Sequence, residues 1–79
     1  MIVKTYSGSR YEISLSSKKI RRLSRTQGVH RDIDDGWVEY SWINISAVAA
    51  PEQIIGSNIR FNKRDGSGSI ETSYVVEIE

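Results

Sequence analysis

Six of the chain's eleven Lys and Arg residues, together with its only His, fall within residues 18–31, and no acid interrupts them. The formal net charge of the whole chain is only +1, so the positive charge is local. Planar Arg side chains bind phosphate oxygens in pairs, and a local basic cluster is what an anion-binding surface requires. The cluster consists of Lys18, Lys19, Arg21, Arg22, Arg25 and Arg31, with His30 beside them. The alternative is a solvated edge strand that uses charge to prevent aggregation.

Aromatic residues follow the basic cluster at Trp37, Tyr40 and Trp42. Strand alternation places Tyr40 and Trp42 on one face and Trp37 on the other. We expect Trp42 to belong to the core and Trp37 to be exposed, where a ring beside a guanidinium can stack on a base. The predicted ligand-binding residues are therefore Lys19, Arg21, Arg22, Arg25, His30, Arg31 and Trp37.

Catalysis and metal binding have little support in this sequence. There is no Cys, and His30 is a lone imidazole in a polar loop, which is a poor position for a general base. The acidic stretch 32–36 does not fit a calcium loop, because its fifth and twelfth positions are Gly36 and Ile43 instead of oxygen ligands. We expect no enzyme activity, no catalytic residue, no metal and no cofactor.

The elements that position these residues alternate at period two, which predicts an all-β fold. A turn at 7–9 joins the first two strands. In the strand at 19–25, a bulge near Arg21 and Arg22 would place Ile20 and Leu23 on the same face. Residues 26–36 then form a loop. Pro51 and a following Gly56 predict at most one short helical turn at 51–55. The result is a small antiparallel six-stranded meander, either a barrel or a twisted sheet, in a single domain over 1–79.

The last strand has the clearest alternation. Its even-numbered positions from Ile70 to Ile78, including Tyr74 and Val76, are predicted to share one face, with Val75 on the other.

A chain of 79 residues without Cys has a marginal core, so self-association is expected. No apolar run is long enough to span a membrane and no signal peptide is evident, so a cytoplasmic location is expected.

Four short phrases are distributed along the chain: SGSRYE at 7–12, RRL at 21–23, DGW at 35–37 and TSYVVEI at 72–78. With them the sequence resembles a loose group of small, mostly uncharacterised β-rich proteins of bacteriophages and bacteria. The resemblance implies a phage setting and a location in the host cytoplasm. Small proteins of this kind act by binding, either as anti-defence sponges for nucleotide-derived signals of bacterial immunity or as inhibitors of a host protein. The resemblance carries no site residues.

Three functions follow from these observations. The first is a homo-oligomeric sponge that encloses an anionic small molecule such as a cyclic nucleotide in a basic and aromatic pocket. The second is an inhibitor that docks on a host protein. The third is a small-barrel nucleic-acid-binding module, whose open strip would show a strong salt dependence that an enclosed pocket would not.

Overall fold

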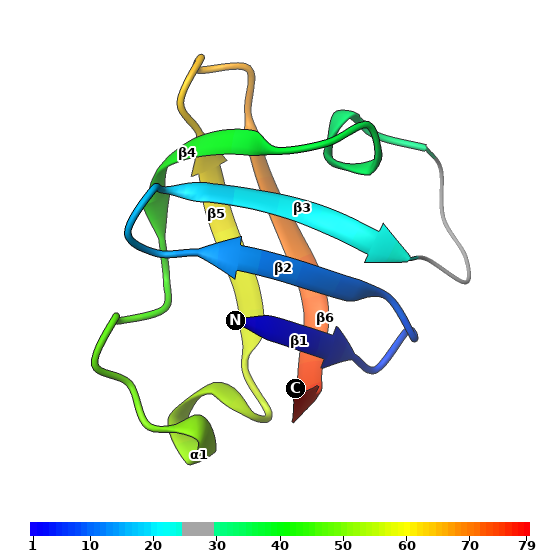
Figure 1. The fold of residues 1–79 in the computed structure, drawn as a ribbon, viewed down its shortest axis with the longest axis vertical. Helices are drawn as coiled ribbons and strands as arrows, with labels where there is room; N and C mark the ends of the chain where they lie inside the picture. The colour runs from blue at the N-terminus through cyan, green and yellow to red at the C-terminus, as the bar shows by residue number, and fades with distance from the viewer. Residues whose placement is uncertain (25–29) are drawn as a thin grey trace.

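Six antiparallel strands close into a barrel in the computed structural model, which describes residues 1–24 and 30–79 (Figure 1). Each strand pairs with the next along the chain, and the last pairs with the first. The all-β, six-stranded antiparallel fold is therefore confirmed, and the barrel is the form it takes. The strands are β1 Ile2–Thr5, β2 Arg10–Ser14, β3 Lys19–Ser24, β4 Val38–Ile43, β5 Asn58–Lys63 and β6 Ser69–Ile78.

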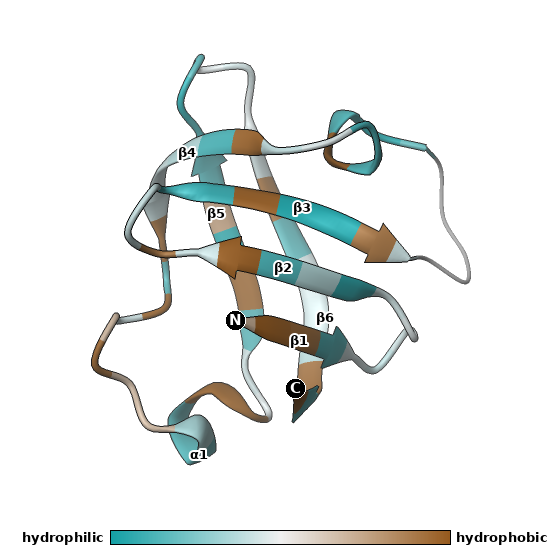
Figure 2. Cartoon of the chain, viewed as in Figure 1, coloured by the Kyte–Doolittle hydropathy of each residue, from teal (hydrophilic) through white to brown (hydrophobic). Residues whose placement is uncertain are grey.

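Alternating side chains fill the barrel interior, as the burial of every second residue in β2 shows, and Figure 2 shows hydrophilic and hydrophobic residues following one another along that strand. Phe61 and Ile59 of β5 are fully buried, and Tyr40 packs its ring 6.3 Å from that of Phe61. The remaining core residues are Val3, Tyr11, Ile13, Ile20, Ile33, Ile54, Ile70 and Val75. Burial of these apolar side chains is the main favourable contribution to folding in so small a chain.

The predicted hairpin turn and helical turn are both confirmed. Between β1 and β2, the Gly8 amide donates to the Thr5 carbonyl over 2.9 Å. The helix α1 (Pro51–Ile54) begins at its proline, and the Gln53 side chain accepts a hydrogen bond from the Ala50 amide at 2.8 Å. Gly56 follows with a φ of 91°, a left-handed conformation that costs glycine little.

The bulge in β3 lies one residue beyond the predicted position. Tyr11 pairs with Arg22 and Arg10 pairs with Ser24, so the extra residue is Leu23. Leu23 is 38% exposed, and the bulge therefore does not bring it into the core with Ile20, as we had expected. Since β3 pairs with β2 on one side and with β4 on the other, it is also not an edge strand.

The predicted faces of β6 are wrong at residues 74–76, whereas Ile78 packs against the core on the side of Ile70, as predicted. Its pairing shifts by one residue against β5 and again against β1, and each shift reverses the side chains that follow. Val75 is fully buried, whereas Tyr74 and Val76 are each 42% exposed. Tyr74 instead stacks on Tyr6, with ring centroids 4.9 Å apart.

A fourth shift lies in β4, where Tyr40 pairs with Lys63 and Trp42 pairs with Asn62. The extra residue, Ser41, turns Trp42 out of the barrel while Tyr40 remains inside at 2% exposure. Trp42 is 45% exposed, so its assignment to the core and to the face of Tyr40 was wrong.

Within residues 1–24 and 30–79, no helix has the length and apolar character needed to cross a membrane.

Candidate functional site

Strand alternation divides the basic cluster between two sides of β3. Arg21 lies on the outer surface with Lys19, whereas Arg22 follows Ile20 toward the interior and its side chain is only 8% exposed. These cations were predicted to form one site, but the structure does not bring them together. Arg25 lies outside the described residues.

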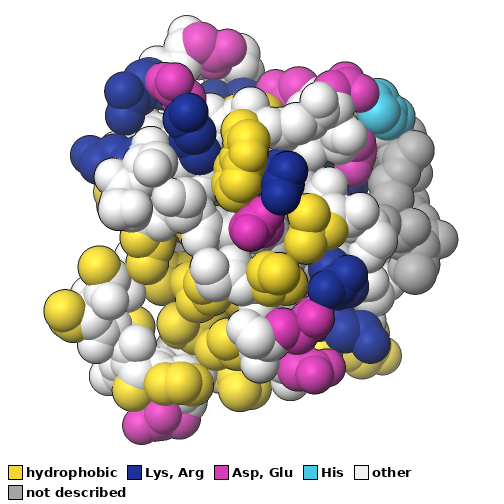
Figure 3. All heavy atoms as spheres, viewed as in Figure 1, with side chains coloured by type: hydrophobic (Ala, Val, Ile, Leu, Met, Phe, Trp, Pro, Cys, Tyr) yellow, Lys and Arg dark blue, Asp and Glu magenta, His cyan; other side chains and the backbone are white. Residues whose placement is uncertain are grey.

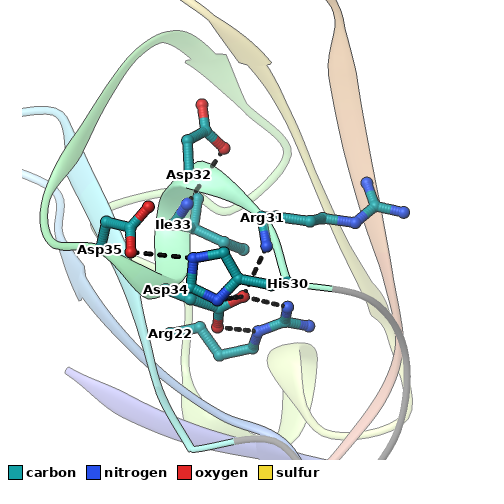
Figure 4. A network of polar contacts seen from close by, with 7 residues as sticks. All are labelled: Arg22, His30, Arg31, Asp32, Ile33, Asp34 and Asp35. Atoms are coloured by element: carbon teal, nitrogen blue, oxygen red, sulfur yellow. Dashed lines mark hydrogen bonds and ion pairs between the residues drawn. The ribbon is translucent and has the colours of Figure 1, made fainter.

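Arg22 forms a two-pronged ion pair with Asp34 in the short helix η1 (Asp32–Asp34). Its Nε donates to Oδ1 and its Nη2 to Oδ2, each over 2.6 Å. These hydrogen bonds raise the pKa of Arg22 above its ordinary value, against the opposing effect of burial. The Arg31 amide donates to the same carboxylate over 2.8 Å (Figure 4). The pair therefore attaches η1 to β3, and we assign Arg22 a structural role.

His30 and Arg31 lie on the same segment but do not join the outer cations. His30 Nε2 is 2.8 Å from Asp35 Oδ1, and the Arg31 side chain points away from Asp34 (Figure 4). Arg31 and Arg22 line a hollow of about 220 Å³ that is otherwise rich in hydroxyl groups. Among the described residues, no three His, Asp or Glu side chains are grouped to hold a metal ion.

Arg21 and Trp37 form the outer half of the predicted site. The Arg21 guanidinium lies 4.4 Å from the centre of the Trp37 ring, and its Nε donates to Glu12 Oε1 over 2.8 Å. Trp37 is 43% exposed, as its position beside the loop had suggested. Its ring borders an open hollow of about 260 Å³ that is also lined by Ser14, Ser17 and Lys19.

Lys19 is the cation of this surface best placed to meet a ligand. Its side chain borders the same hollow as the Trp37 ring. In the part of the chain that the structure describes, Lys19 makes no ion pair, in contrast to Arg21. Its ammonium therefore keeps its full capacity to bind an anion.

A second exposed tryptophan was missed by sequence reasoning. The Arg60 guanidinium lies 5.7 Å from the centre of the Trp42 ring, which repeats the arrangement of Arg21 and Trp37. Trp42 and Lys18 line one hollow of about 230 Å³. The alternation of Ile59, Arg60 and Phe61 does place Arg60 on the outside, but no local signal reveals the bulge that turns Trp42 toward it.

We call the surface around the two rings the tryptophan face. It comprises Trp37 and Trp42, the cations Lys18, Lys19, Arg21, Arg60 and Arg64, and the carboxylates Glu12 and Glu39. These five cations stand against Glu12 and Glu39, and against Glu71, which is the strand partner of Arg60 in β6, on a chain whose net charge is +1. Lys and Arg side chains gather over the ends of β3 and β4 nearest the β2–β3 turn in Figure 3. The face can therefore offer both stacking surfaces and positive charge.

Comparison of the chain with protein-family models, with curated proteins and with solved structures finds no match. The geometry of the tryptophan face is therefore the basis for a functional assignment.

Proposed function

We propose that the protein is a non-enzymatic binding protein for nucleotide-containing anions, with a base stacked on Trp37 and phosphate oxygens held by Lys19 and Arg21. The observation that carries the proposal is the exposed Trp37 ring with a guanidinium 4.4 Å from its centre and Lys19 at the same hollow. Stacking of a base on an aromatic ring contributes about 1–3 kcal/mol. Lys and Arg provide the complementary charge for phosphate.

The ion pair with Glu12 does not prevent Arg21 from binding a phosphate group. The pair is part-exposed, with 39% of the Arg21 side chain and 30% of the Glu12 side chain accessible. An exposed ion pair contributes only about 0–1 kcal/mol, so a phosphate can compete for the guanidinium. Arg also has five N–H donors, more than the Glu12 contact uses.

Two forms of this function remain as proposals. In the first, a second copy of the chain covers the open hollows, and the homo-oligomer sequesters a cyclic nucleotide or a related signal in the host cytoplasm. That form agrees with the phage setting implied by the resemblance, and it needs the second copy because ligand pockets normally bury most of the ligand surface. In the second form, one copy binds nucleic acid along an open face.

The test is titration calorimetry with AMP, a cyclic dinucleotide, ADP-ribose and an octathymidylate. We expect measurable binding of at least one probe, a loss of about 5- to 150-fold in affinity for Trp37→Ala, and a smaller loss for Lys19→Ser. The matched controls are Tyr6→Ala and Lys4→Ser, which remove an exposed ring and an exposed cation elsewhere on the barrel.

The controls should bind as the unmodified protein does. If no probe binds, or if Trp37→Ala binds as tightly as the unmodified protein, the proposal is wrong and docking on a host protein becomes the better hypothesis.

A further inference from the structure

We infer that the ligand of the tryptophan face is a single-stranded nucleic acid, with bases on both Trp37 and Trp42 and phosphates on Lys18 and Lys19 between them. This inference rests on the proposed function and names its ligand class. It adds a second stacking ring and a second lysine, neither of which the proposed nucleotide site requires.

The first observation is continuity across the β2–β3 turn. One hollow is lined by Trp37, Lys19 and Ser17, and the other by Trp42, Lys18 and Leu15. Lys18 and Lys19 are adjacent in sequence, so both hollows border the β2–β3 turn. A ligand that leaves one ring therefore passes the two lysines before it reaches the other.

The second observation is the distance between the rings along β4. Trp37 directly precedes β4 and Trp42 lies five positions further along, so at about 3.3 Å per residue their Cα atoms are at most about 16 Å apart, and the extra residue at Ser41 shortens this distance. At about 3.4 Å per stacked nucleotide, this upper limit matches roughly five nucleotides. A mononucleotide or a cyclic dinucleotide is too short to contact both rings. Duplex DNA is also excluded, because its bases are stacked on one another and cannot place their faces on protein rings.

The third observation is the backbone of Lys18. Its φ of 54° makes it the one non-glycine residue with a left-handed backbone among the described residues. Such a conformation costs an L-residue free energy that Gly avoids and that Asn tolerates well. A lysine at this position therefore lowers stability, and it provides a cation beside the hollow that Trp42 lines.

Charge on the face is sufficient for this ligand even though the whole chain is nearly neutral. At physiological ionic strength, charges beyond about 8 Å are largely screened, so the local excess of cations governs binding. Contacts from Lys18, Lys19 and Arg21 to three phosphates predict a slope of log K against log salt of about −2. The affinity should then fall about 20-fold between 50 and 200 mM salt.

The experiment is fluorescence anisotropy of end-labelled octathymidylate, with competition by unlabelled dithymidylate, a cyclic dinucleotide and a DNA hairpin. We expect Trp37→Ala and Trp42→Ala each to weaken octathymidylate binding by about 5- to 150-fold, while Tyr6→Ala and Lys4→Ser leave it unchanged. The short probes and the hairpin should compete poorly. The affinity should show the salt dependence given above.

A second variant protects the test against loss of folding. Lys18→Gly relieves the left-handed backbone, so it should fold at least as stably as the unmodified protein and still bind octathymidylate several-fold more weakly. Unchanged binding by Lys18→Gly would overturn the inference.

The remaining outcomes separate the inference from the proposed function. If Trp42→Ala binds normally while Trp37→Ala does not, and a cyclic dinucleotide binds as tightly as the octamer, the inference is wrong and the proposed function stands. If none of the probes binds the unmodified protein, both are wrong.

Discussion

Arg21 and Arg22 are neighbours in sequence, yet we expect their removal to have different effects on stability. Arg22→Leu leaves Asp34, which is 12% exposed, without the guanidinium that donates two hydrogen bonds to it. Removing one partner of a buried ion pair costs about 3–5 kcal/mol. A domain of this size has a free energy of unfolding of roughly 4–12 kcal/mol. Arg22→Leu should therefore remove at least about a quarter of the free energy of unfolding.

Arg21→Leu is the matched variant, with the same change of residue type one position away. Its pair with Glu12 is part-exposed and contributes about 0–1 kcal/mol, and the contact with Trp37 adds about 0.5–1 kcal/mol. The expected difference between the two variants is therefore at least about 1 kcal/mol in the free energy of unfolding.

Urea denaturation followed by circular dichroism measures both values. The double variant Arg22→Leu with Asp34→Asn should regain much of the lost stability, because it also removes the buried negative charge that the Arg22 guanidinium had balanced. If Arg22→Leu loses no more stability than Arg21→Leu, the assignment of Arg22 as a structural residue is wrong, and it returns to the list of candidate ligand contacts.

Three further predictions concern stability. Lys18→Asn should raise the free energy of unfolding by up to about 1 kcal/mol in urea denaturation, since Asn tolerates a left-handed backbone; a loss would contradict the strain assigned to Lys18. The hydrogen bond and charge of Arg10 lower the pKa of Glu79 below its ordinary 4.5. The stability that this ion pair contributes is therefore complete above pH 4.5 and is lost as the pH falls through the lower pKa of the folded state. Glu79→Gln should therefore flatten the acid limb of thermal stability, and an unchanged limb would refute the pairing. Phe61→Ala should lower the free energy of unfolding by about 3–5 kcal/mol, so that thermal denaturation shows no cooperative transition above 37 °C. A variant that still unfolds cooperatively above that temperature would show that Phe61 is not central to the core.

Features encoded within a few adjacent residues could be predicted from the sequence. The β1–β2 turn, the proline that begins α1 and the glycine that follows it depend on local backbone preferences, and the structure has all of them. The number of strands and their antiparallel order also follow from turns at regular spacing. The exposure of Trp37 was predicted for the same reason, since it adjoins the loop before β4.

Features set by closure of the barrel could not be predicted in the same way. A bulge is defined by a mismatch between two strands, so its position depends on the partner strand and not on the strand alone. The bulge at Leu23 was therefore predicted one residue too early, and the bulge at Ser41 was not predicted at all. The exposure of Trp42, which depends on the bulge at Ser41, was missed for the same reason. The pairing of Arg22 with Asp34 was also missed, because it joins residues twelve positions apart that meet only in the folded chain.

The bulge at Ser41 connects the requirements of the fold with those of the proposed site. The interior already holds Tyr40 and Phe61, with ring centroids 6.3 Å apart, and closely packed interiors accept additional volume only with strain. Regular alternation in β4 would direct Trp42 into that space beside Tyr40. The extra residue instead leaves Tyr40 in the core and turns Trp42 outward, within reach of Arg60 and beside Lys18. One irregularity thus prevents overpacking of a small barrel and supplies the second ring of the tryptophan face.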